Sequence, residues 1–205
     1  MVSDLWMDRV EVYFQQMPHF VQNHSVSVGY FAQRLLDRLW ETVGADGICE
    51  LQNPARTHAD ILGRYHDIGK TGISDEIWLR TTSLTDDEWK LIRGHTIIGA
   101  HMIKHQIWLP GQGPDPADLQ NVMAECCLYH HERWDGTGYP FQLKGEQIPF
   151  FARVISVAEA FSAMTADRPY HAGVSAAQAL KEIRKGAGGQ FDPTLAEAFC
   201  AACSE

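Results

Sequence analysis

The stretch Arg153-Val154-Ile155-Ser156-Val157-Ala158-Glu159-Ala160-Phe161 repeats apolar side chains at intervals of three and four residues. That interval is typical of an α-helix with one buried face. The same spacing occurs far upstream, at Val26, Tyr30, Phe31 and Leu35. Because this period dominates most of the chain, we expect an all-α fold, a single-domain helical bundle.

Glycine and proline residues divide the helical pattern and predict where the helices end. Thr85, with Glu88 three residues later, is a candidate helix cap. A chain of 205 residues can bury one sizeable core and requires no second one. We expect an N-terminal helix within residues 1–20 and one domain over residues 21–205. The expected helices cover residues 5–16, 22–42, 55–66, 85–93, 95–107, 117–130, 150–165, 175–185 and 192–202.

The charge and composition exclude several classes of function. The net charge of −9 argues against a nucleic-acid polymer as partner, because such a partner needs a basic stripe, but it allows a small phosphorylated ligand. The chain has no apolar run long enough to cross a bilayer and no signal-like start, so we expect no membrane association and a cytoplasmic location. Five cysteines, an odd number, favour reduced thiols.

Glu159 stands among the apolar residues of the opening stretch, where a buried, unpaired carboxylate would cost several kcal/mol. A bound cation would remove that cost. Imidazoles and carboxylates are the ligands that zinc, manganese and ferrous iron take in proteins. The chain offers a His-Asp pair at residues 66 and 67 and further histidines at 24, 95, 130 and 131. The candidate metal ligands are therefore His24, His66, Asp67, His95, His130, His131 and Glu159.

For any one histidine the ordinary interpretation is a hydrogen-bonded or exposed side chain, and only the joint pattern favours a metal site. His101 and His105 have a helical spacing that could hold a metal, but no third ligand is apparent, so we expect them to face solvent. Cys200 and Cys203 have no second cysteine pair, which favours a packing role.

Four segments of the chain carry a family resemblance. They are His66-Asp67-Ile68-Gly69-Lys70, residues 84–100, His130-His131 through Gly138-Tyr139-Pro140, and residues 153–170. Together they resemble the HD-GYP family, a branch of the HD metallohydrolase superfamily, and the resemblance covers about residues 20 to 200. It implies an all-α fold of the HD-domain type. It also implies hydrolysis of a bacterial cyclic dinucleotide, chiefly cyclic di-GMP and alternatively cyclic GMP-AMP, to the linear dinucleotide or onward to GMP.

Carried over by position, the resemblance implies two metal ions that share Asp67. His24, His66, Asp67 and Glu159 would hold one ion, and Asp67 would bridge to a second ion held by His95, His130 and His131. Iron or manganese is implied first, with zinc, nickel or magnesium as alternatives. A carboxylate has two oxygens and can span two cations, which can activate a bridging hydroxide as the nucleophile.

The resemblance also implies the residues that meet the substrate. Lys70 would contact a phosphate or stabilise the leaving group, so that Asp67 and Lys70 form the catalytic pair. Arg168 would bind the second phosphate, while Gly138 and Tyr139 would form the edge of the cleft. The Gly-Tyr-Pro loop is tied in the family to GGDEF-domain partners, and a homodimer is a further expectation.

Three departures from the family pattern involve four positions. Residue 159 is Glu where the family usually has Asp. Phe20 replaces the acidic ligand of three-metal members, which predicts two metals. Ser162 and His171 stand where charged side chains near the phosphates are common. Glu159 favours one alternative, a module that binds metal, cyclic dinucleotide or a GGDEF partner without turnover. Another alternative is an HD phosphohydrolase of mononucleotides or alarmones, and the Gly-Tyr-Pro loop argues against it.

Overall fold

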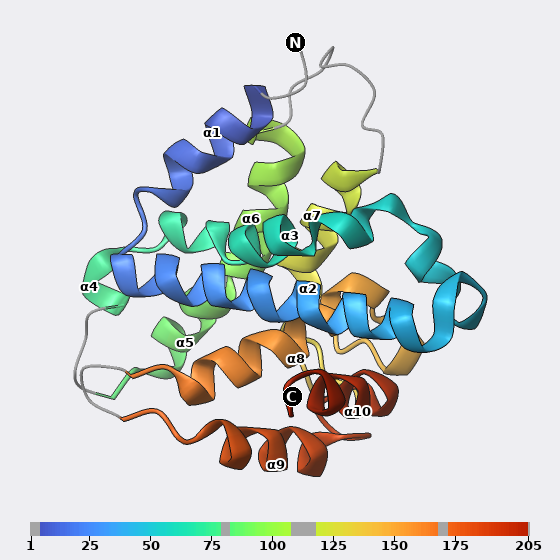
Figure 1. The fold of residues 1–205 in the computed structure, drawn as a ribbon. Helices are drawn as coiled ribbons and strands as arrows, with labels where there is room; N and C mark the ends of the chain where they lie inside the picture. The colour runs from blue at the N-terminus through green and yellow to red at the C-terminus, as the bar shows by residue number, and fades with distance from the viewer. Residues whose placement is uncertain (1–4, 79–82, 108–117, 168–171, 205) are drawn as a thin grey trace.

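The computed structural model describes residues 5–78, 83–107, 118–167 and 172–204, and these residues form a helical bundle (Figure 1). No strand occurs among them, and the expected all-α fold is confirmed. The α-helices are α1 Leu5–Phe14, α2 His19–Gly47, α3 Ala59–Tyr65, α4 Asp75–Trp78, α5 Asp86–Arg93, α6 His95–Met102, α7 Leu119–Tyr129, α8 Phe150–Thr165, α9 Ala176–Gly186 and α10 Pro193–Ala202. Shorter helical turns are η1 Cys49–Gln52, η2 Pro54–His58, η3 Ile68–Gly72, η4 Ile103–Ile107 and η5 Gly145–Gln147.

The expected helices are present, with local differences. The expected helix over residues 55–66 is a 3₁₀ turn followed by α3, and the one over residues 95–107 is α6 followed by one turn of π-helix. The short helix α4 was not expected. The expected cap at Thr85 is confirmed, because its hydroxyl accepts from Glu88 N at 3.3 Å while Glu88 accepts from Thr85 N at 2.8 Å.

Helix α2 crosses the middle of the molecule between α3 and α8 (Figure 1). Its buried face meets α8 and α10 through three phenylalanine rings. The ring centroid of Phe31 lies 4.8 Å from that of Phe161 and 6.2 Å from that of Phe199, and Phe161 and Phe199 are 5.2 Å apart. Edge-to-face contacts of this kind add to the stabilisation that apolar burial supplies. The apolar residues of the opening stretch thus anchor α8 against the central helix.

Two pairs of glycines allow the backbones to approach closely where the candidate site forms. Gly29 of α2 faces Gly63 of α3, and a Cβ on Gly63 would lie 2.5 Å from Gly29 Cα. Gly69 of η3 faces Gly99 of α6, and a Cβ on Gly69 would lie 2.0 Å from His95 O. Real Cβ atoms cannot occupy such positions. These contacts bring α2, α3, η3 and α6 together around residues 66 and 67.

The N-terminal helix α1 packs into the same core as the rest of the described chain. Trp6, Val10 and Phe14 are buried in it. Glu11 accepts hydrogen bonds from Arg64 Nη2 at 2.9 Å and from the Tyr65 hydroxyl at 2.8 Å. The proposed division at residue 20 stays a prediction. Within the described ranges, no helix combines the length and apolar character that crossing a bilayer requires.

Candidate metal centre

Asp67 lies at the centre of the candidate site and is fully buried. It lies between α3, which ends at Tyr65, and η3, which begins at Ile68, so the chain turns at this point. His66 precedes it and is 1% exposed. The close contacts of Gly63 with α2 and of Gly69 with α6 position this pair between His24 and His95. Two side chains that are adjacent in sequence therefore meet ligand candidates from both neighbouring helices.

One group of side chains surrounds Asp67 on the side of α6 and α7. His95 Nε2 lies 3.2 Å from Asp67 Oδ1, and His130 Nε2 lies 3.7 Å from the same oxygen. His131 completes the group, and all four ligand atoms lie within 4.8 Å of one another.

A second group surrounds Asp67 on the side of α2 and α8. His66 Nε2 lies 3.4 Å from Asp67 Oδ2. His24 and Glu159 complete the group, again with all ligand atoms within 4.8 Å of one another. The extra methylene of Glu159 thus leaves its carboxylate inside the group. The structure brings together all seven candidate ligands in the two sets that the resemblance implied, and Asp67 belongs to both. Phe20 belongs to neither group and is 51% exposed.

Backbone carbonyls orient three of the imidazoles. The Nδ1 atoms of His66, His95 and His130 lie 2.6, 2.6 and 2.8 Å from the carbonyl oxygens of Gly63, Ile92 and Cys126. A carbonyl can only accept, so each Nδ1 carries the hydrogen, and each Nε2 points toward Asp67. This is the arrangement by which proteins set the tautomer of histidines that bind metals.

Burial controls the charges in the site. It lowers the pKa of His66, and it lowers the pKa of His130 and of His131 to well below the usual value, so these imidazoles are neutral at neutral pH. Burial alone would raise the pKa of Asp67. The charge of Lys70 is the first of the interactions that outweigh that effect, and together they hold the Asp67 pKa well below its ordinary value. The site therefore presents an ionised carboxylate among neutral nitrogen donors.

This donor set fits divalent metal ions. His66 Nε2 and Asp67 Oδ1 are buried and make no hydrogen bond. With its hydrogen on Nδ1, neutral His66 directs a lone pair at an ionised oxygen. Such contacts are unfavourable unless a cation lies between the atoms, and a polar atom buried without a partner costs about 1–3 kcal/mol. Nitrogen and carboxylate oxygen together suit zinc, iron and manganese.

Lys70, the expected partner of Asp67 in catalysis, contacts that carboxylate. Lys70 Nζ donates to Asp67 Oδ2, and its side chain lines a cavity of about 290 Å³ with Gln16, Met17 and Pro18. The expected contact of Lys70 with a phosphate stays a prediction. Arg168 lies outside the described residues.

A cavity of about 350 Å³ opens beside the candidate metal ligands and is bordered by His130, His131 and Glu159. Gly138 and Tyr139 line it, as expected for the edge of a cleft. A Cβ at Gly138 would lie 2.4 Å from Arg133 N, so this glycine permits a close approach within the protein's own loop. The Tyr139 ring stacks on the His131 ring with centroids 4.8 Å apart. Burial, followed by the charges of Glu159 and Asp67, raises the pKa of the Tyr139 hydroxyl.

Sequence reasoning missed two residues at the site and the role of a third. Ser162, noted only as a departure from the family pattern, is buried, and its Oγ lies 2.9 Å from His24 Nδ1, so it orients a ligand candidate. Glu132 accepts from the backbone N–H groups of Phe141 and Leu143 at 2.7 and 3.1 Å, which holds the loop that carries Tyr139. Arg93 lines the cavity. Glu132 follows His131 directly and Arg93 precedes His95 by two positions, and that proximity was the available signal.

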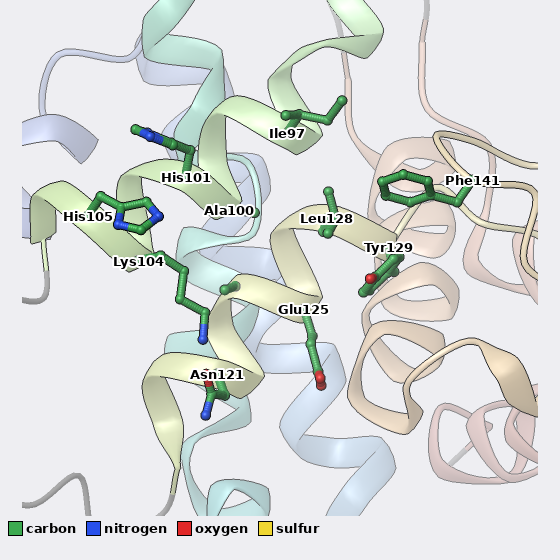
Figure 2. A pocket seen from close by; sticks show the side chains of 11 residues that line it. Ile97, Ala100, His101, Lys104, His105, Asn121, Glu125, Leu128, Tyr129 and Phe141 are labelled. Atoms are coloured by element: carbon green, nitrogen blue, oxygen red, sulfur yellow. The ribbon is translucent and has the colours of Figure 1, made fainter.

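A separate cavity of about 440 Å³ lies between α6, η4 and α7 (Figure 2). His101 and His105 lie on its wall with ring centroids 4.7 Å apart, and both are exposed, as expected. Neither belongs to a cluster of three or more possible ligands in the described part of the chain.

Comparison with known proteins agrees with this geometry. The sequence model of the HD domain family matches residues 18–195 of the chain. A cyclic di-GMP phosphodiesterase of Pseudomonas aeruginosa is 39% identical over 150 residues, which cover 73% of this chain and 34% of the relative. A 3′3′-cGAMP-specific phosphodiesterase of Vibrio cholerae is 30% identical over 153 residues, covering 73% and 28%. The chain thus spans about a third of the length of these curated relatives.

A solved structure extends the likeness to the whole fold. The crystal structure of a cyclic GMP-AMP specific phosphodiesterase of V. cholerae aligns with a TM-score of 0.64 at 19% identity. The alignment covers 100% of this chain and 49% of that one. At this identity the likeness supports the helical fold alone.

Proposed function

The chain belongs to the HD domain family, and from that premise we propose that it is a metal-dependent phosphodiesterase acting on a cyclic dinucleotide. The observation that carries the proposal is the pair of ligand groups that share Asp67. Cyclic di-GMP is the first choice of substrate, since the more similar of the two relatives is named for it. 3′3′-cGAMP is the second choice.

In this proposal the seven side chains hold two divalent ions, with iron or manganese ahead of zinc, nickel and magnesium. Two such ions would lower the pKa of water and neutralise charge that gathers on the reacting phosphate. Asp67 supplies one carboxylate to both. The carbonyls of Gly63, Ile92 and Cys126 keep the Nε2 atoms of three imidazoles directed inward. Ser162 performs the same task for His24.

The remaining residues bind and orient the substrate. Tyr139 lines the cavity, and its hydroxyl, which carries a proton at neutral pH, would donate a hydrogen bond to a phosphate oxygen. Lys70 partly balances the charge of Asp67 and would contact the reacting phosphate or stabilise the leaving group. Arg168 contributes its fork of donors to the other phosphate. The loop around Gly138 forms the wall of the cavity and is also the proposed contact for a GGDEF-domain partner. We also propose that the protein forms a homodimer and lies in the cytoplasm.

The experiment compares wild type with Asp67→Asn, both purified without oxygen. Wild type is expected to contain about two metal ions per chain and to hydrolyse cyclic di-GMP, as followed by elemental analysis and chromatography of products. Asp67→Asn is expected to lose both ions and at least 100-fold in turnover, because its amide carries no charge to share between cations. Asp60→Asn, an exposed change on α3, is the matched control.

Normal turnover by Asp67→Asn would refute the metal mechanism. Tight binding of cyclic di-GMP by wild type without product, under iron, manganese, zinc, nickel and magnesium, would establish the non-hydrolysing alternative. Turnover of mononucleotides in place of cyclic dinucleotides would establish the other alternative, an HD phosphohydrolase of mononucleotides or alarmones.

A further inference from the structure

The cavity beside the metal ligands must accept an anion if the proposed function holds, although the chain carries a net charge of −9. A cyclic dinucleotide has two phosphodiesters on opposite sides of its ring, each with one negative charge. The reacting phosphate lies at the ions, so the second one needs a cation elsewhere in the cavity.

Two arginines line this cavity, and one of them is already engaged. Arg133 donates to both oxygens of Asp135, at 3.3 and 2.9 Å, and to the Thr137 hydroxyl at 2.9 Å. Its charge is therefore balanced within the loop that carries Tyr139. Arg93, by contrast, forms no ion pair with any carboxylate in the described ranges, and its side chain is exposed at the rim.

The position of Arg93 is set by stacking. Its guanidinium carbon lies 5.1 Å from the centroid of the Tyr139 ring, and that ring stacks on His131 at 4.8 Å. A cation over an aromatic ring is held by the charge distribution of the ring. The Tyr139 ring therefore lies between Arg93 and the candidate metal ligand His131, so Arg93 is separated from the ligand groups by one aromatic ring.

We propose that Arg93 binds the second, non-reacting phosphate of the cyclic dinucleotide from the Tyr139 stack, alongside Arg168, to which the proposed function assigns the same phosphate. This inference rests on the proposed function and adds a substrate-binding residue to it. A planar guanidinium keeps several N–H donors free while its face lies on a ring, and phosphate oxygens are its preferred partners. The competing interpretation is structural, because a basic residue in the last turn of α5 also stabilises the end of that helix.

The test compares two diesters on the metal-loaded protein. Cyclic di-GMP has two phosphates, whereas bis(p-nitrophenyl) phosphate has one, which must lie at the ions. Arg93→Gln is expected to raise the KM for cyclic di-GMP roughly 10- to 100-fold, with kcat little changed and hydrolysis of bis(p-nitrophenyl) phosphate unaltered. Arg93→Lys, which keeps the charge, is expected to restore part of the affinity.

Lys90→Gln is the matched control, because it removes the same charge from the same helix one turn earlier, where Lys90 pairs with Asp87. It is expected to leave both substrates unaffected. Equal losses on both substrates by Arg93→Gln, or a lower melting temperature with unchanged KM, would overturn the inference in favour of the structural role. Wild type that hydrolyses neither diester would overturn the proposed function itself, and the inference with it.

Discussion

At the scale of single residues, Asp67 and Glu159 have different tasks although both are carboxylates at the same site. Asp67 belongs to both ligand groups, whereas Glu159 belongs to one. Glu159 approaches the other group through His131, whose Nε2 lies 3.8 Å from Glu159 Oε1. A change at Asp67 should therefore affect the binding of both ions, whereas a change at Glu159 should affect only one.

Glu159→Gln is expected to lower the metal content from about two ions to about one per chain, because the group of His95, His130, His131 and Asp67 keeps all its ligands. Elemental analysis of Glu159→Gln and Asp67→Asn, purified in parallel, measures the metal content of each variant and checks this prediction. A Glu159→Gln protein that retains both ions would show that this carboxylate is no ligand.

At the scale of elements, the site depends on close contact between η3 and α6. Gly69→Ala places a Cβ 2.0 Å from His95 O and close to Gly99 N, so one of the two elements must move. We expect a loss of about 2–4 kcal/mol in the free energy of unfolding and a weaker affinity for metal. Urea unfolding and metal titration measure the two effects.

Gly72→Ala is the control for that change. Its added Cβ would meet only the side chain of Ile98, at 3.0 Å, and a side chain can adjust where backbone cannot. Equal stability losses in the two variants would contradict the argument that contact of η3 with the α6 backbone positions Asp67.

The contact between α1 and α3 carries a pH dependence. Burial, followed by the hydrogen bond to Glu11, raises the pKa of Tyr65 to about 12. Because the pKa is raised in the folded protein, the protonated hydroxyl of Tyr65 contributes fully to stability below pH 10, which is about the tyrosine pKa in the unfolded chain. That contribution is lost as the pH rises through 12. We expect the free energy of unfolding of wild type to exceed that of Tyr65→Phe by about 1 kcal/mol at pH 8. This difference should disappear as the pH approaches 12. A gap independent of pH would contradict this assignment.

At the scale of the whole molecule, the ligand candidates come from α2, the turn after α3, α6, the end of α7, and α8 (Figure 1). Ions bound among them would join most of the bundle. We expect removal of metal by a chelator to lower the free energy of unfolding by about 4 kcal/mol, the value for free metal at a thousand times its Kd.

The corresponding fall in melting temperature is roughly 10 °C for a chain of this size. Calorimetry with and without chelator measures it. The Asp67→Asn variant, which lacks the shared ligand, is expected to melt at the same temperature under both conditions. A chelator effect of equal size in that variant would place the bound metal elsewhere.

The sequence by itself determined the helical class, most helix positions and the chemical types at the site. These are local properties. The period of apolar residues defines a helix face, Thr85 and Glu88 cap a helix through bonds over three residues, and imidazoles and carboxylates keep their ligand chemistry in any fold. The family resemblance then implied how the seven candidate ligands divide into two groups.

Tertiary structure alone decided which distant groups support those ligands. Ser162 meets His24 across 138 positions, and Arg93 reaches Tyr139 from another element. The glycine contacts between helices that position Asp67 belong to the same class. No local period encodes such pairs, because they depend on how helices pack and on the distance at which their backbones stop. That packing separates Arg93, available to a ligand, from Arg133, already balanced by Asp135.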